Sequence, residues 1–332
     1  MKAKAIVKIC LCSLLAVVLT VGLVGGILAL KSGGMESISA LRLFSFNVEY
    51  YDDAELYTAG GGTVAGDVAE LDIHWTDGAV NVTVGNGTDI VLRESGAGNG
   101  EALRWLLQNG RLTVRDRKSG VHRSSVERTL EVELPARLLR ELKIDSASAD
   151  VFLTGVAAGT LELDTASGRL EAKHCTFDAV DIDCASTDCR FEDCKLGRFE
   201  MDTASGNATL RGSVERVELE TTSGDLEIVS SSVPYSIEVE STSADVSLTL
   251  PVNAAFDAKL KSVSGDLKVE GFIGTYGSNR FTTLPAGTAF DAKIVSTSGD
   301  MKNEGFVRTD GSGMAEYRFD SVSGDVWIAA AE

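Results

Sequence analysis

Histidine, proline and basic residues are scarce in this chain of 332 residues. It has three histidines and four prolines, aromatic residues make up 6% of it, and 31 Lys and Arg stand against 49 Asp and Glu, a formal net charge of -18. This balance excludes a general nucleic-acid binder, which needs a basic surface to displace counterions from phosphate. Glycine is plentiful, with 34 residues, and the composition is typical of many short strands joined by glycine turns.

The sequence motifs of common enzyme classes are also missing. It contains no Gly-x-Ser-x-Gly elbow, no His-Glu-x-x-His helix and no phosphate-binding loop. Carboxylates at glycosidase-like separations are expected on any acidic repeat and so carry no specificity. We therefore expect a protein that is not an enzyme and has no cofactor beyond weakly bound Ca2+ or Mg2+.

One long apolar run occurs, at residues 9–30, and three lysines lie among the eight residues before it. At 1.5 Å per residue the run reaches about 33 Å, enough to cross a bilayer core. We expect a cytoplasmic basic tail at 1–8, an uncleaved signal-anchor at 9–30, and residues 31–332 outside the cytoplasm by the positive-inside rule. A cleaved signal peptide is the alternative, although the residues after the run form a poor cleavage site.

Internal repetition is the strongest signal. The segment LELDTASGRL at 161–170 recurs as VDIDCASTDC at 180–189, FEMDTASGNA at 199–208 and VELETTSGDL at 217–226. The central serines of the copies are Ser148, Ser167, Ser186, Ser205, Ser223, Ser243, Ser264, Ser298 and Ser323. Their spacing is 19, 19, 19, 18, 20 and 21 residues, then 34 and 25.

Each copy alternates apolar and acidic residues, the period of a strand with one buried face, and then has a small Ser-Gly or Ser-Ala corner. One coil of a β-solenoid consists of a strand, a corner, a second strand and a return, and about nineteen residues are enough for it. A propeller blade needs about forty residues. The sequence predicts an all-β fold, a single-stranded parallel β-solenoid of about nine or more coils, preceded by one transmembrane helix. Its inward Leu, Ile, Val and Phe would form one continuous core.

The rest of the chain can be divided into regions by how regularly the repeat occurs in each. We expect a linker at 31–67, an N-terminal β capping region at 68–141 with a brief helix at 101–108, and the regular solenoid at 142–250. Residues 251–332 carry a duplication with an offset of 34 residues, and we expect C-terminal coils there with protruding loops.

The outward residues of the first strand would stack as two acidic columns. The columns contain Asp145, Asp164, Asp183, Asp202, Glu220 and Glu240, and Glu162, Asp181, Glu200, Glu218 and Glu238. Like charges about 5 Å apart cost up to ~1 kcal/mol per pair in water-like dielectric. Either salt screens a solvated ladder, or divalent cations or a cationic partner neutralise this face; oxygen-only ligands would suit Ca2+ or Mg2+.

Two cysteines lie nineteen residues apart, Cys175 and Cys194, and so fall in one column within disulfide range. Cys184 and Cys189 flank one corner, and both should face inward. A disulfide, free buried thiols and a zinc site all remain open.

A third column lies just after the corners. It contains Asp150, Arg169, Asp188, Asn207, Asp225, Asp245 and Asp266. Because acids alternate with Arg or Asn in its first half, we expect it to relieve repulsion between neighbouring coils.

A basic stretch and a few aromatic residues are further candidates for contacts. The basic residues are Arg111, Arg115, Arg117, Lys118, His122, Arg123 and Arg128, and the aromatic ones are Trp75, Trp105, Tyr276, Phe281 and Trp327. The basic residues could form a solvated face or meet anionic lipid; the aromatic residues could be core residues or stack on sugars.

Ser-Gly-Asp corners recur at 223–225, 298–300 and 323–325, and Leu-Glu-Val-Glu-Leu-Pro at 130–135 leads into the repeats. With these motifs the chain, over about residues 68 to 330, resembles a bacterial domain family of unknown function labelled "putative adhesin" with β-strand repeats. The resemblance implies a cell-envelope β-solenoid, often behind one membrane segment. It brings no catalytic residues.

Together these observations predict a single-pass, extracytoplasmic, non-catalytic scaffold of the cell membrane with an adhesin-like or envelope-interaction role. The alternatives are an envelope-stress accessory or sensor protein that docks a membrane partner, and a glycan-active β-helix enzyme. Expected partners are the lipid bilayer through 9–30, a cell-envelope polymer or a membrane protein, and a second copy through the C-terminal coil edge.

Overall fold

The computed structural model describes residues 46–49, 51, 53–96, 102–117, 120–123, 128–251, 256–264, 267–270, 290–296, 315–323 and 326–330. The chain divides into one unit of Met1–Tyr51 with Ser119–Ser125 and a second unit of Asp52–Lys118 with Val126–Glu332. In the first unit, β1 (Phe46–Glu49) pairs antiparallel with β9 (Gly120–Arg123). The predicted anchor at 9–30 lies outside the described residues, among which no helix has the length and apolarity to span a membrane.

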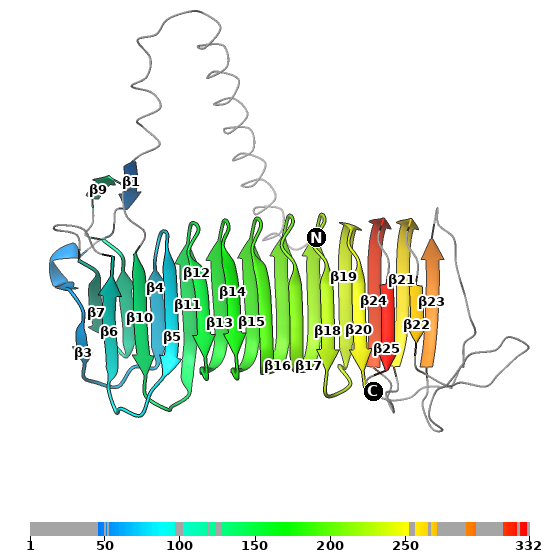
Figure 1. Ribbon diagram of the computed structural model, residues 1–332, viewed down its shortest axis with the longest axis horizontal. Coiled ribbons are helices and arrows are strands. Elements are labelled where there is room, and N and C mark those ends of the chain that lie inside the picture. Colours follow the sequence, from blue (N-terminus) through cyan, green and yellow to red (C-terminus); the bar gives the residue numbers. More distant parts are fainter. Residues whose placement is uncertain are drawn as a thin grey trace, which may run out of the picture. The chain divides into compact units, whose positions relative to one another are not determined.

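The second unit contains the predicted parallel β-solenoid, whose strands lie side by side in Figure 1. Six regular turns follow one another in sequence order, from residue 139 to residue 250. Their strands are β11 (Leu139–Ser146), β12 (Asp150–Thr154), β13 (Ala157–Thr165), β14 (Arg169–Lys173), β15 (Thr176–Cys184), β16 (Asp188–Thr203), β17 (Ala208–Thr221), β18 (Leu226–Ser230), β19 (Ser236–Ser243) and β20 (Val246–Leu250). We call the side formed by β11, β13, β15, the ends of β16 and β17, and β19 the first face. The other strand segments form the second face.

The register confirms the period near nineteen. Leu161 pairs with Val180, Val180 with Phe199, Phe199 with Val217 and Val217 with Ile237, and all five are buried. The serines of the corners also stack, since each corner serine from the second regular turn to the sixth donates its backbone N–H to a carbonyl of the preceding turn, at 2.9–3.1 Å. Equivalent residues of successive turns are therefore neighbours in space.

The corner motif has a local cause. The hydroxyl of Thr203 accepts the backbone N–H of Gly206 at 2.9 Å, and Thr221 accepts that of Gly224 at 2.8 Å. A hydroxyl three residues before the corner glycine thus closes the turn. Gly206 is required because a Cβ there would lie 2.1 Å from the carbonyl oxygen of Thr187 on the preceding turn.

The N-terminal end of the stack does not follow the order of the sequence. The turn of β4 (Glu70–His74) and β5 (Ala79–Val84) pairs with β11 and β12 on one side, and with β8 (Arg111–Arg115) and β10 (Thr129–Leu134) on the other. Antiparallel strands complete this end: β6 (Ile90–Ser95) on β10, β7 (Arg104–Gln108) on β8, β3 (Gly62–Val64) on β6 and β2 (Thr58–Ala59) on β7. A short 3-10 turn, η2 (Ala54–Leu56), precedes them.

Two expectations change at this end. The brief helix predicted at 101–108 is wrong, because residues 104–108 form β7; pairing with β8 overrides local preference. Within the predicted linker at 31–67, residues 58–59 and 62–64 are strands that pair with the rest of this unit.

The C-terminal end is also out of sequence order. β24 (Ala315–Ser323) lies between β19 and β21 (Phe256–Ser264), so a red strand separates two yellow ones in Figure 1. β25 (Val326–Ala330) likewise lies between β20 and β22 (Leu267–Glu270), while β23 (Phe290–Ser296) pairs with β21 at the predicted offset of 34 residues.

About six regular turns stack in sequence order, so the predicted solenoid of about nine or more coils is confirmed only as a parallel β-solenoid of about six regular turns. The strand order at this end also bears on the edge expected to meet a second copy. The last strands of the sequence, β24 and β25, are paired on both sides.

Candidate binding surface

The first face carries the two predicted acidic columns. The strand register places Asp145, Asp164, Asp183, Asp202, Glu220 and Glu240 in one row, and Lys143, Glu162, Asp181, Glu200, Glu218 and Glu238 in the next. Side chains on these rows are half-buried or exposed; that of Glu200 is 28% exposed and that of Glu218 is 43% exposed. They point outward because they alternate with buried residues such as Leu161 and Leu163.

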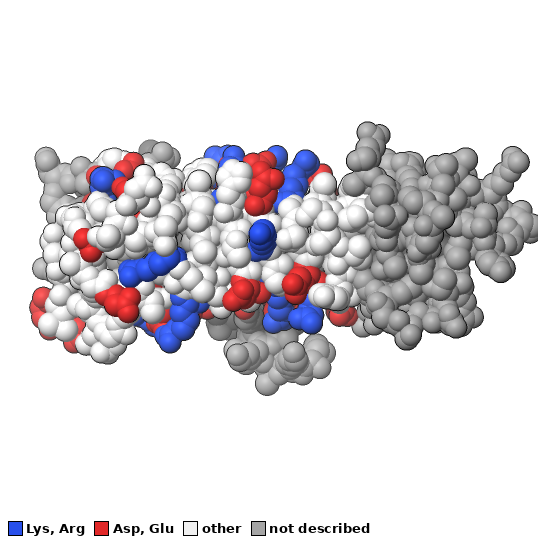
Figure 2. Space-filling model, turned by 90° about the horizontal axis from the view of Figure 1, so that it is seen from below, with Lys and Arg blue, Asp and Glu red and all other residues white. Residues whose placement is uncertain are grey.

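On the second face, basic or uncharged residues interrupt the rows of acids in the six regular turns, as Arg169 and Asn207 do in the corner column. One outward row there reads Phe152, Glu171, Arg190, Thr209, Glu227 and Ser247. Figure 2 looks along the strands onto one edge of this unit, where acidic and basic side chains are interspersed among uncharged ones. The negative charge of the regular turns is therefore concentrated on the first face.

Lys143 neutralises the start of the acidic rows. Its Nζ lies 3.1 Å from Oδ2 of Asp164 and 3.7 Å from Oδ1 of Asp145, and it also hydrogen-bonds Glu162. Partial burial lowers the pKa of Lys143, but these carboxylates outweigh that effect and raise it above the usual range. Further along, Arg198 pairs with Glu200 and, at 3.2 Å, with Glu218.

Carboxylates in the middle of the face still repel one another. Partial burial, then the charges of Asp181, Glu218 and Asp202, raise the pKa of Glu200 despite the opposing effect of Arg198. Partial burial and four neighbouring glutamates raise the pKa of Glu220. A bound cation would relieve this repulsion.

Beyond β19, the row that contains Glu238 continues with basic residues in place of acidic ones. In the register, Glu238 is followed by Arg318 on β24, then Lys259 on β21 and Lys293 on β23. The spacing of the repeat could have shown this basic end, because Lys259, Lys293 and Arg318 each lie five residues before a corner serine, as Glu238 does. Only the place of Arg318 between Glu238 and Lys259 depends on the inserted position of β24.

A histidine between two aspartates lies where β4 joins the first face. Nε2 of His74 is 3.2 Å from Oδ1 of Asp72, and Nδ1 is 3.1 Å from Oδ2 of Asp145. One potential ligand atom from each residue lies within 4.8 Å of the others, and His with carboxylates is a donor set for transition metals. Burial raises the pKa of Asp72, but His74 more than offsets it and the pKa is lowered; burial raises the pKa of Asp145. His74 could have been found from the match of Leu71-Asp72-Ile73-His74 to Leu142-Lys143-Ile144-Asp145.

The corner column is structural, as predicted. Arg169 donates to Asp150 at 2.9 Å, and the amide of Asn207 donates to Asp188 at 3.0 Å. The side-chain oxygens of Asn207 and Asp225 then accept the backbone N–H of the equivalent residue on the next turn, both at 2.9 Å. Asp266 lies outside the described residues.

The four cysteines of the regular turns are free thiols. Cys175, Cys189 and Cys194 are buried and Cys184 is half-buried. The structure places Cys175 against Cys194 as predicted, without a disulfide between them. Within the described turns the cysteines take part in no metal-ligand cluster, which argues against the zinc alternative.

Three arginines of the basic stretch that the structure describes are paired with carboxylates. Arg117 and Arg128 are 3% and 4% exposed, and they pair with Asp116 at 2.9 Å and with Glu94, respectively. The exposed Arg111 pairs with Glu70 at 2.5 Å. The reading as a contact for anionic lipid is thus not supported for these three; the side chains of Lys118, His122 and Arg123 lie outside the described part.

The aromatic residues that could stack on sugars are either buried or partly buried, or their side chains lie outside the described part of the chain. Trp75 is buried under Arg128, whose guanidinium lies 5.3 Å from the ring centroid, and Trp105 is partly buried and donates to the carbonyl of Gly60. Tyr276 and Phe281 lie outside the described residues, and only the strand of Trp327, β25, is described.

An open polar cavity of about 420 Å3 lies at the N-terminal end of the stack. Its lining residues are Asp53, Tyr57, Glu70, Leu106, Gln108, Asn109, Arg111 and Thr113. Its volume falls within the usual range of small-molecule sites, and most of its polar lining comes from the antiparallel end of the unit.

Comparison with protein families decides what this fold is. The family model described as Toastrack DUF4097 matches residues 68–302, well over half of the chain. The chain belongs to the Toastrack DUF4097 family. This confirms the resemblance to a family of adhesin-like domains of unknown function. No protein with a curated description matches the chain.

Several solved structures are similar to this Toastrack chain at low identity. A "putative lipid binding protein" from Parabacteroides distasonis is 12% identical, with 83% of this chain and 98% of that chain covered and a TM-score of 0.41. A "putative adhesin" from Bacteroides fragilis is 10% identical, with 86% and 100% covered and a TM-score of 0.39. A "putative cell adhesion protein" from Clostridium sporogenes is 11% identical, with 83% and 100% covered and a TM-score of 0.31.

Proposed function

We propose that this Toastrack protein is a non-catalytic scaffold of the cell envelope whose acidic first face binds a cationic partner. Residues 9–30 anchor it in the membrane and residues 31–332 lie outside the cytoplasm. The observation that carries the proposal is the concentration of carboxylates on one face of six stacked turns.

The two faces of the regular turns differ in how their acids are placed. Acids placed only for solubility could be scattered over both faces, where each would be separated from like charges and cost less. Instead they stack on adjacent strands, about 4.8 Å apart, and the pKa values of Glu200 and Glu220 are raised by this crowding as well as by burial. A partner with regularly spaced positive charges would remove the repulsion on binding and gain affinity from it.

The regular spacing also indicates the kind of partner. A row that repeats at every turn presents the same group many times in a line, which suits an extended envelope polymer or a basic protein segment. A compact small molecule would meet only one or two turns. We therefore assign the partner as a polycation of the envelope or a cationic segment of a surface protein.

Charge-matched variants of the full chain test this function. Asp181→Asn, Glu218→Gln and Glu238→Gln together remove three charges from the first face; Glu171→Gln, Glu192→Gln and Glu227→Gln remove three from the second. Polylysine and isolated cell envelopes serve as probes in a binding assay at low and physiological salt. We expect the first variant to bind at least about tenfold more weakly and the second to bind like the unmodified protein. Equal effects of the two variants would refute a specific acidic binding face.

The membrane placement is tested separately. Protease added to intact cells should digest residues 31–332 while a tag before residue 1 stays protected. A protected solenoid would overturn the extracytoplasmic placement and leave the binding result unaffected.

A further inference from the structure

Cys175 and Cys194 occupy the same position on consecutive turns. Thr176 pairs with Lys195 in the register, which places the residues before them, the two cysteines, side by side. The backbone N–H of Lys195 donates to the carbonyl of Cys175 at 2.9 Å, and the N–H of Cys175 lies 3.4 Å from Sγ of Cys194. Adjacent strands of a sheet hold such residues about 4.8 Å apart at Cα, inside the range that a disulfide spans.

Both side chains point into the core and face each other. Cys175 is 1% exposed and Cys194 is 2% exposed. A hydrogen bond between the two thiols, with burial, raises the pKa of Cys175, and the same bond lowers the pKa of Cys194. The Cys175 thiol also lies 3.3 Å from the carbonyl of Lys173, and Sγ of Cys194 lies 3.4 Å from the carbonyl of Ala172 on the turn of Cys175, so the Cys194 side chain reaches back over the preceding turn.

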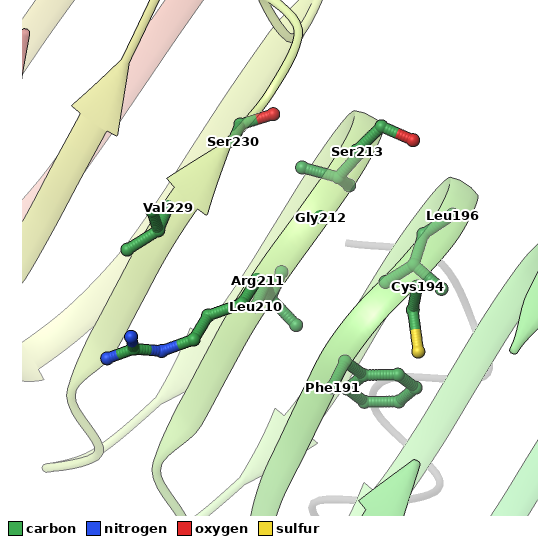
Figure 3. A pocket seen from close by; sticks show the side chains of 10 residues that line it. Phe191, Cys194, Leu196, Leu210, Arg211, Gly212, Ser213, Val229 and Ser230 are labelled. Atoms are coloured by element: carbon green, nitrogen blue, oxygen red, sulfur yellow. The ribbon is translucent and has the colours of Figure 1, made fainter. Parts of the chain in front are cut away.

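The next turn places a glycine, Gly212, against Cys194. The register shifts between Phe191 and Cys194, and Cys194 then pairs with Gly212, which has no side chain. A small cavity of about 10 Å3 borders Cys194, Leu210 and Gly212, and Figure 3 shows Cys194, Gly212 and Ser230 on three neighbouring strands. A Cβ at Gly212 would lie 2.1 Å from the carbonyl oxygen of Cys194, so the following turn can approach Cys194 only with a glycine at this position.

The other two cysteines lack this arrangement. Cys184 pairs with Thr165, and Cys189 pairs with Leu170 and Ala208, so neither has a cysteine at its position on a neighbouring turn. They act as an internal control for the effect of stacking.

We propose that a disulfide between Cys175 and Cys194 links two consecutive turns of the solenoid when the chain folds in an oxidising compartment; its formation in the cell rests on the extracytoplasmic placement proposed above. A small-molecule disulfide is the oxidant. The Cys194 thiolate attacks one of its sulfurs and releases one thiol; Cys175 loses its proton and attacks the Cys194 sulfur, which releases the second thiol. Two protein thiols are oxidised and one small disulfide is reduced to two thiols.

Refolding with a defined oxidant tests the pairing directly. The full chain is unfolded, reduced, and refolded with oxidised glutathione as the probe; free thiols are alkylated and the protein is cut before each aspartate. This cleavage puts each of the four cysteines of the regular turns on its own peptide: 164–177 for Cys175, 183–187 for Cys184, 188–192 for Cys189 and 193–201 for Cys194; Cys10 and Cys12 share the peptide 1–51. We expect mass spectrometry to find 164–177 joined to 193–201. Scrambled pairs, a Cys184–Cys189 bond alone, or complete alkylation would each overturn the proposal.

Thermal unfolding with and without reductant gives a second readout. Closing a loop of this length restricts the unfolded chain, so reduction should lower the melting temperature of the refolded protein by about 5 °C. The variant Cys184→Ala with Cys189→Ala should keep this difference, and Cys175→Ala with Cys194→Ala should lose it. A reductant effect that persists without Cys175 and Cys194 would contradict the assignment.

Alkylation of free thiols in intact cells distinguishes a failure of the Cys175–Cys194 disulfide from a failure of the extracytoplasmic placement. One outcome is that the linked peptides form on refolding while both thiols are reduced in cells. That result would overturn the extracytoplasmic placement, and it would also show that the protein in the cell lacks the disulfide. If refolding also fails to link the peptides, the disulfide is wrong whatever the compartment, and binding by the acidic face is unaffected.

Discussion

Single residues at the corners decide whether one turn can lie on the next. Thr203 and Thr221 close their corners with a side-chain oxygen, and Gly206 lets the carbonyl of Thr187 approach where a Cβ would otherwise sit. The Thr-x-Ser-Gly pattern of the sequence is therefore a packing requirement. Its regular recurrence does not by itself indicate a ligand site.

Substitution of the corner glycine tests this requirement. Gly206→Ala should lower the free energy of unfolding by about 1–3 kcal/mol, because the new methyl group overlaps a backbone carbonyl that cannot move without shifting a whole turn. Denaturant unfolding measures the change. Gly62→Ala is the control, since a Cβ at Gly62 would meet no atom within 4 Å. Equal effects of the two would show that the corner is not tightly packed.

Raised carboxyl pKa values on the first face predict an unusual pH dependence. A carboxyl group whose pKa is higher in the folded chain binds protons more readily there, so the fold gains stability as the pH falls through that pKa. For Glu200 and Glu220 we expect the free energy of unfolding to increase from pH 7 toward about pH 5. The free energy of unfolding should decrease at lower pH. Asp72 has a lowered pKa in the folded chain, so its ionised form stabilises the fold, and this stabilisation is lost when Asp72 becomes protonated.

Denaturant titrations at several pH values measure this profile. Glu220→Gln should reduce the gain between pH 7 and about pH 5, whereas Glu227→Gln on the second face should leave it unchanged. A profile that falls steadily with acidification, in the same way in both variants, would contradict the inferred repulsion.

At the scale of the strand, each turn depends on the turns beside it. Leu163 on β13 is in register with Ile144 on β11 and Ile182 on β15, and all three are buried. An inward residue is therefore shared among three turns.

A charge placed inward should unfold more than its own strand. Leu163→Asp should cost about 4 kcal/mol or more, because it buries an unpaired carboxylate in that shared core. Thr160→Asp adds the same charge at a half-buried position of the same strand and should change stability by less than about 1 kcal/mol. Hydrogen exchange would show the affected strands; protection lost only within β13 would contradict the shared core.

The sequence predicts the strands well and their order in space only in part. The alternation at 161–164 and the constant spacing of the serines predict the register of six turns and both acidic columns. The reordered ends could not be predicted, because a parallel edge offers the same backbone groups to any turn with an apolar inner row. His74 was missed for that reason, because it joins the first face through β11, which is remote in sequence. Lys259 could have been placed after Glu238 from the spacing of the serines, whereas the insertion of Arg318 between them could not.

At the scale of the whole second unit, the regular turns have one acidic face that is not fully neutralised. Lys143 and Arg198 offset part of the charge, and the remainder repels. A face of this kind should respond to divalent cations more strongly than to monovalent salt of equal ionic strength.

Adding millimolar Ca2+ at low ionic strength should raise the melting temperature by a few degrees, since a divalent cation screens neighbouring carboxylates together. The variant with Asp181→Asn, Glu218→Gln and Glu238→Gln should respond less than the variant with three changes on the second face. Absence of any shift would show that the face does not gather cations.

The inserted position of β24 and β25 has a consequence for biosynthesis. Residues 256–270 leave the ribosome before residues 315–330, yet they occupy the position one turn further out. A nascent solenoid that simply added each new turn to the last would place β21 on β19 and close the gap. To reach the observed arrangement, the earlier segment must wait undocked or be displaced by the later one, so assembly at this end cannot be strictly vectorial.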